Sequence, residues 1–213
     1  MAPIRIIVAD AQELVADGLR YRLARETDLK IVAHVGSGKE LFELLKEVPA
    51  DLVLLDVSLP GMDGIDTARM LRKKHPKVKV LAHSMLDGIE YVNSMLIEGA
   101  GGYLLKNSPK AGLLQAIRMV MDGERYLSDA VRASMEKGYK FTQKRPDGEY
   151  IGLTEREREI IRMIAQERTN DEIGAALNLS TDTVKTHRKN LMTKLNVRSA
   201  AGLVRYAVDR CWT

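Results

Sequence analysis

A regular alternation of short apolar runs with helical patterns constrains the first half of this chain most strongly. The apolar runs cover residues 4–9, 29–35, 52–55, 78–82 and 101–105. They lack polar alternation, which is typical of strands buried on both faces of a parallel sheet. Between and after them, apolar residues recur at helical spacing. The pattern predicts an α/β domain with a doubly wound, five-stranded parallel sheet covered by helices on both faces.

Polar residues stand where four of these predicted strands end. In an open parallel sheet, functional groups gather beyond the carboxyl ends of the strands. The positions are Asp10, Asp56, Ser84 and Lys106. Any one of them could simply be a polar residue where a strand meets water. Four in order indicate a site that holds two carboxylates, a hydroxyl and an ammonium group.

The second half of the chain contains a basic helical stretch, residues 179–198. Ser180 can cap a helix that begins at Thr181. Val184, Leu191 and Leu195 form one narrow apolar stripe, and the cations lie away from it: Lys185, Arg188, Lys189 and Lys194. Such a helix suits a polyanion, although a charged stretch is also typical of a solvated surface helix.

Two helix starts precede this basic helix and favour the nucleic-acid reading. Thr154 with Glu157, and Thr169 with Glu172, each fit a capping box. A fourth helix is expected over residues 200–209. The order of helix, short helix, turn and basic helix predicts an all-α, four-helix domain with a helix-turn-helix, whose basic helix enters the major groove of double-stranded DNA.

Length and polar composition place the domain boundaries. The 213 residues suffice for two small domains. We expect the α/β domain over residues 1–125, a linker over 126–150 and the helical domain over 151–213. Residues 137–150 are polar, with two glycines and a proline, as in a flexible tether.

Net charge and cysteine content limit the possible binding partners and the expected cellular compartment. The net charge of +4 and the pI of about 9.1 permit nucleic-acid binding without proving it. Cys211 is the only cysteine, so no intramolecular disulfide can form, which suits a reducing cytosol. No apolar run approaches the roughly 18 residues of a membrane span. We therefore expect a cytoplasmic protein without a membrane partner.

Two apparent motifs carry no function. Residues 36–39 resemble a phosphate-binding loop, but Ala33 and Glu40 occupy positions that such a loop reserves for glycine and Ser/Thr, so a strand-to-helix turn is expected. The four histidines show no metal-ligand spacing with one another or with Cys211. They are His34, His75, His83 and His187.

The first half resembles the receiver domain of two-component response regulators. The resemblance rests on residues 56–64 (DVSLPGMDG), on Ser84 in HSM, and on residues 102–106 (GYLLK). It implies that Asp56 is the phosphoryl acceptor, that Ser84 binds a phosphoryl oxygen and that Lys106 offsets its charge. Tyr103 matches the aromatic position whose rotation reports the Ser84 contact to the surface.

Residues 153–207 resemble the LuxR/GerE-type DNA-binding domain, and the whole chain resembles the NarL/FixJ-type class. The matching segments are LTERE from Leu153, EI from Glu172, LS from Leu179, TVKTH from Thr183 and KLNV from Lys194. The resemblance implies that Lys185, Thr186 and Lys189 face base edges. It assigns Thr183, Arg188 and Lys194 to phosphates, and His187 either packs in the domain or contacts a phosphate.

One residue departs from the receiver pattern. That family places two adjacent acids after the first strand, whereas this chain has Asp10 followed by Ala11. The implied Mg²⁺ site then consists of Asp10, Asp56 and the backbone carbonyl of Ser58, without a direct ligand at Ala11. Because the cation gathers the phosphoryl oxygens, weak or absent Mg²⁺-dependent phosphorylation at Asp56 is expected.

The leading interpretation is a sequence-specific, DNA-binding transcription regulator that is not an enzyme. Its input is expected to be atypical, with a protein partner, dimerisation set by concentration or a receiver that already rests in its active shape in place of phosphate. The alternative is a conventional regulator that a sensor histidine kinase switches by phosphorylation. An aspartyl phosphatase or dehalogenase is a third reading, but Val57 and Ser58 replace its expected Asp-x-Asp pairing. We also expect a homodimer.

An apolar edge of the last predicted helix has two possible roles, a dimer contact or packing within its own domain. One recognition helix covers few base pairs, so two-fold pairing on DNA is the usual solution. An apolar edge of the last helix could form that contact, or it could equally pack against the first helix of its own domain. This edge consists of Leu203, Val204, Ala207 and Val208.

Overall fold

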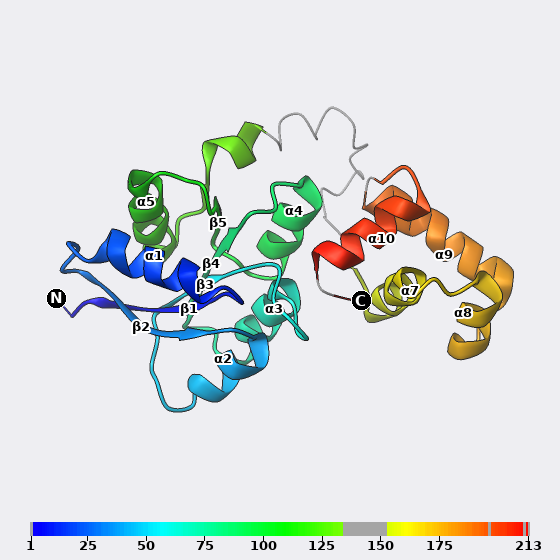
Figure 1. Cartoon of the computed structure of the whole chain (residues 1–213), viewed down its shortest axis with the longest axis horizontal. Helices are drawn as coiled ribbons and strands as arrows, with labels where there is room; N and C mark the ends of the chain where they lie inside the picture. The colour runs from blue at the N-terminus through cyan, green and yellow to red at the C-terminus, as the bar shows by residue number, and fades with distance from the viewer. Residues whose placement is uncertain (1, 134–152, 196, 211, 213) are drawn as a thin grey trace. The chain divides into compact units, whose positions relative to one another are not determined.

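The computed structural model describes the chain except for residues 1, 134–152, 196, 211 and 213. It divides into two compact units, Met1–Gln143 and Lys144–Thr213. Each unit is described by itself (Figure 1). Within the described residues, no helix is long and apolar enough to cross a membrane.

The first unit is a parallel sheet with the strand order β2-β1-β3-β4-β5-β6. Its strands are β1 Ile4–Ala9, β2 Leu29–Val35, β3 Leu52–Leu55, β4 Lys79–Ser84, β5 Gly102–Leu105 and β6 Tyr126–Leu127. Its helices are α1 Glu13–Leu23, α2 Gly38–Leu44, α3 Gly64–Lys74, α4 Ile89–Ile97 and α5 Lys110–Met121. Residues 129–133 are also helical.

The structure confirms the predicted α/β fold and corrects its strand count. The sheet has six strands rather than five, because Tyr126 and Leu127 pair in parallel with β5 beyond the expected end of the domain. Two residues are too few to show a strand pattern in sequence. Pro109 stands at the N-cap of α5 with extended backbone, and the helix begins at Lys110.

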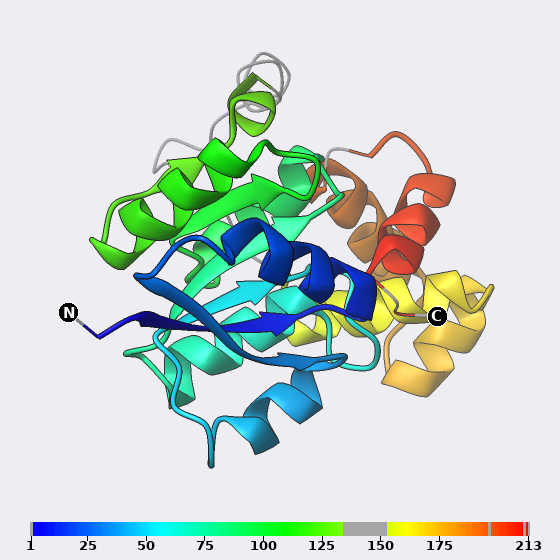
Figure 2. The ribbon, with the colours of Figure 1, turned by 60° about the vertical axis from the view of Figure 1, so that its left-hand side comes forward.

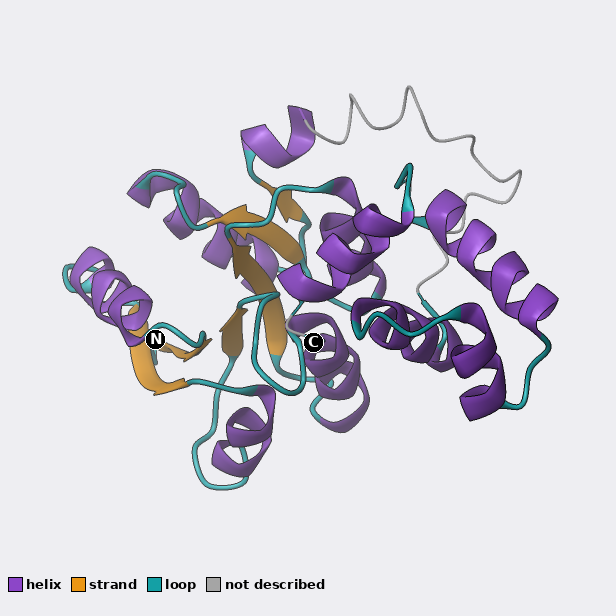
Figure 3. Cartoon of the chain, turned by 45° about the vertical axis from the view of Figure 1, so that its right-hand side comes forward, coloured by secondary structure: helices purple, strands orange, loops and turns teal. Residues whose placement is uncertain are grey.

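Helices cover both faces of the sheet. Helices α1 and α5 lie on one face, and α2, α3 and α4 lie on the other (Figures 1 and 3). Alternate residues of each central strand enter the two cores, as in Ile6 and Val8 of β1, which pack with Leu19 of α1 and Ile117 of α5. Burial on both faces explains why these strands read as continuous apolar runs.

The loop after β3 depends on a glycine. A Cβ atom added at Gly64 would lie 1.9 Å from the carbonyl oxygen of Asp56, which no side chain can tolerate. The close approach lets the chain fold back over the end of β3. The carboxylate of Asp63 then caps α3 by accepting hydrogen bonds from the backbone N–H groups of Ile65 and Asp66. The strand end and the start of α3 are thereby held together.

The second unit consists of α7 Glu155–Ala165, α8 Asn170–Leu177, α9 Thr181–Lys194 and α10 Ala200–Asp209. Both predicted capping boxes are present, at Thr154 with Glu157 and at Thr169 with Glu172. Asn178 ends α8 in the left-handed conformation. Glycine at position 174 allows the backbone of Leu179 to pass close by, since an added Cβ would lie 2.7 Å from its carbonyl oxygen. These residues build the tight turn before α9.

Apolar side chains from all four helices close the core of this unit. Ile161, Ile173, Leu191 and Leu203 are fully buried. The predicted edge of α10 is divided, because Leu203 and Ala207 face the core whereas Val208 is 52% exposed. Figure 2 shows the order of α7 to α10 from a second side.

Candidate functional site

The four polar residues predicted at the strand ends form one cluster. The ammonium nitrogen of Lys106 lies 2.7 Å from Oδ2 of Asp10 and 2.7 Å from Oδ2 of Asp56. The contact with Asp56 is a hydrogen bond, whereas the contact with Asp10 is an ion pair outside hydrogen-bond geometry. Both carboxylates are buried, with Asp10 1% and Asp56 6% exposed. The parallel strands β1, β3 and β5 bring these residues together.

The ammonium group of Lys106 is held in its charged form. Burial alone lowers the pKa of Lys106, but the negative charges of Asp56 and Asp10, together with the hydrogen bond to Asp56, outweigh it and raise this pKa above its usual value. The cluster therefore carries one positive and two negative charges, and its lysine already occupies one oxygen of each carboxylate.

Ser84 and Tyr103 connect the cluster to the loop between β4 and α4. The hydroxyl of Ser84 donates a 2.7 Å hydrogen bond to Oδ1 of Asp56, and it accepts a 3.4 Å bond from the backbone N–H of Leu86. The ring of Tyr103 is fully buried, and its hydroxyl donates a 2.6 Å hydrogen bond to the carbonyl oxygen of Leu86. Both side chains thus hold the same loop at Leu86.

The residue after Asp10 has no side-chain oxygen. Ala11 is exposed, and the backbone N–H of Gln12 donates a 3.0 Å hydrogen bond to the other carboxylate oxygen of Asp10. The ring of His34 contacts the carbonyl oxygen of Asp10 at 2.8 Å. The ligand oxygens predicted for a hard cation are those of the Asp10 and Asp56 carboxylates and the backbone carbonyl of Ser58, which are oxygen donors of the kind that Mg²⁺ prefers.

The sequence alone does not indicate that the pKa of His83 is shifted. It is 4% exposed, and burial, reinforced by the positive charge of Lys106, lowers its pKa to about 4. A lone histidine in an apolar strand gives no signal of this kind, because the shift arises from the packing around β4.

Helix α9 presents most of the residues predicted to contact DNA. Thr183, Lys185, Thr186 and Lys189 are exposed, and His187 is half-buried. Lys185 forms an ion pair with Asp182 one turn earlier at 2.9 Å. The half-buried guanidinium of Arg188 donates a 2.9 Å hydrogen bond to the side-chain oxygen of Asn170, which fixes α9 against α8.

Lys194 lies in a different environment from the other cations of α9. Its ammonium nitrogen is 2.7 Å from Oε2 of Glu157, and the two side chains are only 18% and 15% exposed. The same carboxylate oxygen accepts hydrogen bonds from the backbone N–H and the hydroxyl of Thr154. The capping box of α7 is therefore also the anchor for the end of α9, a pairing across 37 positions that leaves no local signal in the sequence.

Both halves of the chain match known families. Residues 6–118 match the response regulator receiver domain, and residues 152–207 match the bacterial regulatory proteins of the luxR family. The transcriptional regulatory protein MctR of Rhizobium johnstonii is 34% identical over 206 residues, which cover 97% of this chain and 94% of that protein. The nitrate/nitrite response regulator protein NarP of Escherichia coli is 33% identical over 197 residues, covering 92% and 91%.

Solved structures share the fold across the whole chain. RcsB from Salmonella enterica serovar Typhimurium, bound to promoter DNA with a phosphomimetic, aligns with a TM-score of 0.70 at 23% identity and covers 97% of this chain and 98% of its own. Response regulator ChrA of a heme-sensing two-component system aligns with a TM-score of 0.55 at 27% identity over the full length of both chains.

Proposed function

The chain belongs to the response regulators that join a receiver domain to a luxR-type DNA-binding domain, and we propose that its receiver adopts the signalling arrangement without a phosphoryl group. It is a DNA-binding transcription regulator and not an enzyme. The proposal concerns its input: Mg²⁺-dependent phosphorylation of Asp56 is weak, and the DNA-binding form does not require it.

The observation that supports this proposal most directly is the hydrogen bond between Ser84 and Asp56. In the receiver family, the residue at Ser84 binds a phosphoryl oxygen and the aromatic residue at Tyr103 follows it. Here the Ser84 hydroxyl reaches Oδ1 of Asp56 directly at 2.7 Å, and Tyr103 is already buried on the carbonyl of Leu86. The carboxylate oxygen takes the place of the phosphoryl oxygen as the acceptor.

The charge balance supports weak phosphorylation. Both oxygens of Asp56 accept hydrogen bonds, from Ser84 and from Lys106. With alanine at position 11, two carboxylates and one ammonium leave a single net negative charge to attract a divalent cation. A metal bound by Asp10 and Asp56 would compete with Lys106 for carboxylates that the lysine already contacts at 2.7 Å.

Phosphorylation with acetyl phosphate tests the proposal. We expect little labelling of the wild-type protein in millimolar Mg²⁺, and a clear gain at Asp56 in Ala11→Asp, which restores a ligand oxygen. Labelling must disappear in the double variant Ala11→Asp/Asp56→Asn. Asp56→Asn alone keeps an acceptor for Ser84, so its affinity for DNA should stay within about twofold of wild type.

A conventional, kinase-dependent regulator is the second candidate. The presence of Asp56, Ser84 and Lys106 in one cluster favours it, since these are the residues that phosphoryl transfer uses in this family. Efficient Mg²⁺-dependent labelling of the unaltered protein at Asp56, with a matching gain in DNA affinity, would establish this alternative and rule out the first. A sensor histidine kinase would then be the partner.

For DNA recognition we propose that α9 enters the major groove. Its exposed side chains Lys185, Thr186 and Lys189 would face base edges, and Thr183 with Arg188 would hold phosphates, while His187 supports the helix from its half-buried position. Because Glu157 engages the ammonium of Lys194, we assign Lys194 to positioning α9 rather than to a strong phosphate contact. A homodimer on paired half-sites completes the proposal, as in the RcsB dimers solved on DNA.

A further inference from the structure

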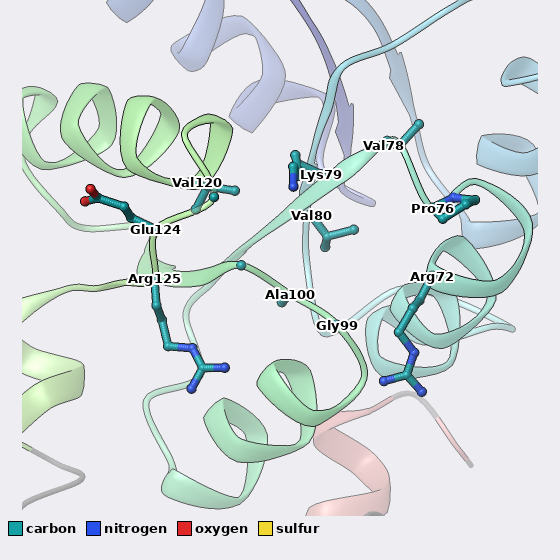
Figure 4. Close-up of a pocket in the computed structure, with 12 residues that line it drawn as sticks. Arg72, Pro76, Val78, Lys79, Val80, Gly99, Ala100, Val120, Glu124 and Arg125 are labelled. Carbon is teal, nitrogen blue, oxygen red and sulfur yellow. The ribbon is translucent and has the colours of Figure 1, made fainter.

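A hollow of about 230 Å³ lies at the edge of the receiver sheet opposite to Asp56. It is bordered by the first residues of β4 and by the turns that lead into β5 and β6, that is, by the amino ends of three parallel strands. The side chains that matter come from separate elements: Arg72 from the end of α3, Lys79 from β4 and Arg125 from the residues before β6 (Figure 4).

Cations dominate this hollow. Among the described residues, neither the ammonium of Lys79 nor the guanidinium of Arg125 forms an ion pair, and both residues are exposed. Arg72 is partly engaged, because it donates hydrogen bonds to the carbonyl of Ile97 at 2.6 Å and to Glu98 at 3.4 Å. The lining acid is Glu124, and Figure 4 shows its carboxylate pointing away from the Gly99–Ala100 segment.

Two glycines let the backbone pass close to side chains of the lining. Gly99 has a φ of +107°, which L side chains rarely adopt, and an added Cβ would meet the stem of Arg72 at 3.0 Å. A Cβ at Gly101 would meet Val120 at 2.9 Å. Val80 and Val120 add apolar side chains to the lining.

We propose that this hollow binds a small phosphate-bearing anion, such as inorganic pyrophosphate or the diphosphate of a nucleotide. Arginine offers a planar fork that matches phosphate oxygens, and lysine adds a point charge. The volume is below the range of about 300 to 1,000 Å³ that is usual for drug-sized ligands, which favours a compact anion. The ligand would tie Arg125, just before β6, to the turn after α4. The proposal does not depend on the phosphorylation of Asp56.

Calorimetric titration of the full-length protein with inorganic pyrophosphate tests this site, at constant ionic strength. Separate titrations with orthophosphate and ADP identify the source of the phosphate groups. We expect one bound anion per chain and about tenfold weaker binding in Lys79→Ala and in Arg125→Ala. Lys77→Ala, an exposed lysine outside the lining, is the matched control and should bind as wild type.

The basic helix α9 is the competing anion site, so Lys189→Ala is titrated in parallel. Loss of binding in Lys189→Ala with retention in Arg125→Ala would overturn the proposal, and so would the absence of binding of all three anions to wild type. Thermal unfolding without ligand shows whether Lys79→Ala and Arg125→Ala are folded. Preference for ADP over pyrophosphate would identify a nucleotide, and binding of orthophosphate alone would identify a single-phosphate site.

Discussion

At the scale of the single residue, His83 lies beside the cluster of Asp10, Asp56, Ser84 and Lys106, and it affects the stability of the fold. Its imidazole is buried in β4, directly before Ser84, and carries a pKa of about 4 instead of 6.5. The folded chain therefore keeps this ring neutral at neutral pH, whereas the unfolded chain protonates it below pH 6.5. The contribution of the neutral His83 ring to the free energy of unfolding is therefore complete above that pH and is lost as the pH falls toward 4.

We predict that the protein loses about 2 kcal/mol of unfolding free energy through His83 between pH 7 and pH 5. His83→Leu, which needs no proton, should flatten the pH dependence by that amount in urea unfolding experiments. His75→Gln is the control, since this half-exposed ring lies at the end of α3. An unchanged slope in His83→Leu would show that the ring is not held neutral.

At the scale of the element, α9 divides its cations between recognition and positioning. Lys189 is exposed and belongs to the proposed DNA surface, whereas Lys194 is bound to Glu157. We predict that Lys189→Ala costs on the order of 1–3 kcal/mol of DNA affinity and relaxes preference at one base position. Binding to a set of operator variants measures both effects.

Lys194→Ala should behave differently. It should lower the free energy of unfolding by about 1 kcal/mol, and Glu157→Gln should reproduce much of that loss, because each variant weakens the same half-buried ion pair. Any loss of DNA affinity should be equal for all sequences. If Lys194→Ala instead left stability intact and reduced the salt dependence of binding, its ammonium would contact a phosphate after all.

Helices and strands could be predicted from the sequence where neighbouring residues determine them. Strands β1, β2 and β3 match the predicted residues, and α9 begins at Thr181 as Ser180 indicated, because apolar runs and caps act over a few positions. The convergence of Asp10, Asp56 and Lys106 followed from topology. The bridge of Lys106 between both carboxylates, the Leu86 carbonyl as acceptor for Tyr103, and the pairing of Lys194 could not be predicted, since they depend on side-chain placement between distant segments.

At the scale of the whole molecule, α10 exposes one large apolar side chain that is suited to assembly. Leu203 and Ala207 face the core of their own domain, which accounts for half of the predicted edge, but Val208 is 52% exposed and Val204 is half-buried. We predict that Val208→Asp weakens cooperative binding to paired half-sites by placing a charge at the proposed contact, with an unchanged unfolding midpoint.

Analytical ultracentrifugation with and without operator DNA, together with footprinting, measures this effect. Arg205→Asp, an exposed position on the same helix, is the matched control for the added negative charge. A footprint of one half-site at saturating wild-type protein would exclude the dimer. A Val208→Asp variant with full cooperativity would place the contact on another surface.

The short strand β6 has a practical consequence for anyone who isolates the receiver. It hydrogen-bonds along β5, whose four residues are buried, and Val131 beyond it is also fully buried. The receiver match ends at residue 118, before β6 begins. A fragment cut there would present β5 as a bare edge with unsatisfied backbone groups, a template for adding strands from other chains. Such a fragment should aggregate, and one that extends through Val131 should stay monodisperse.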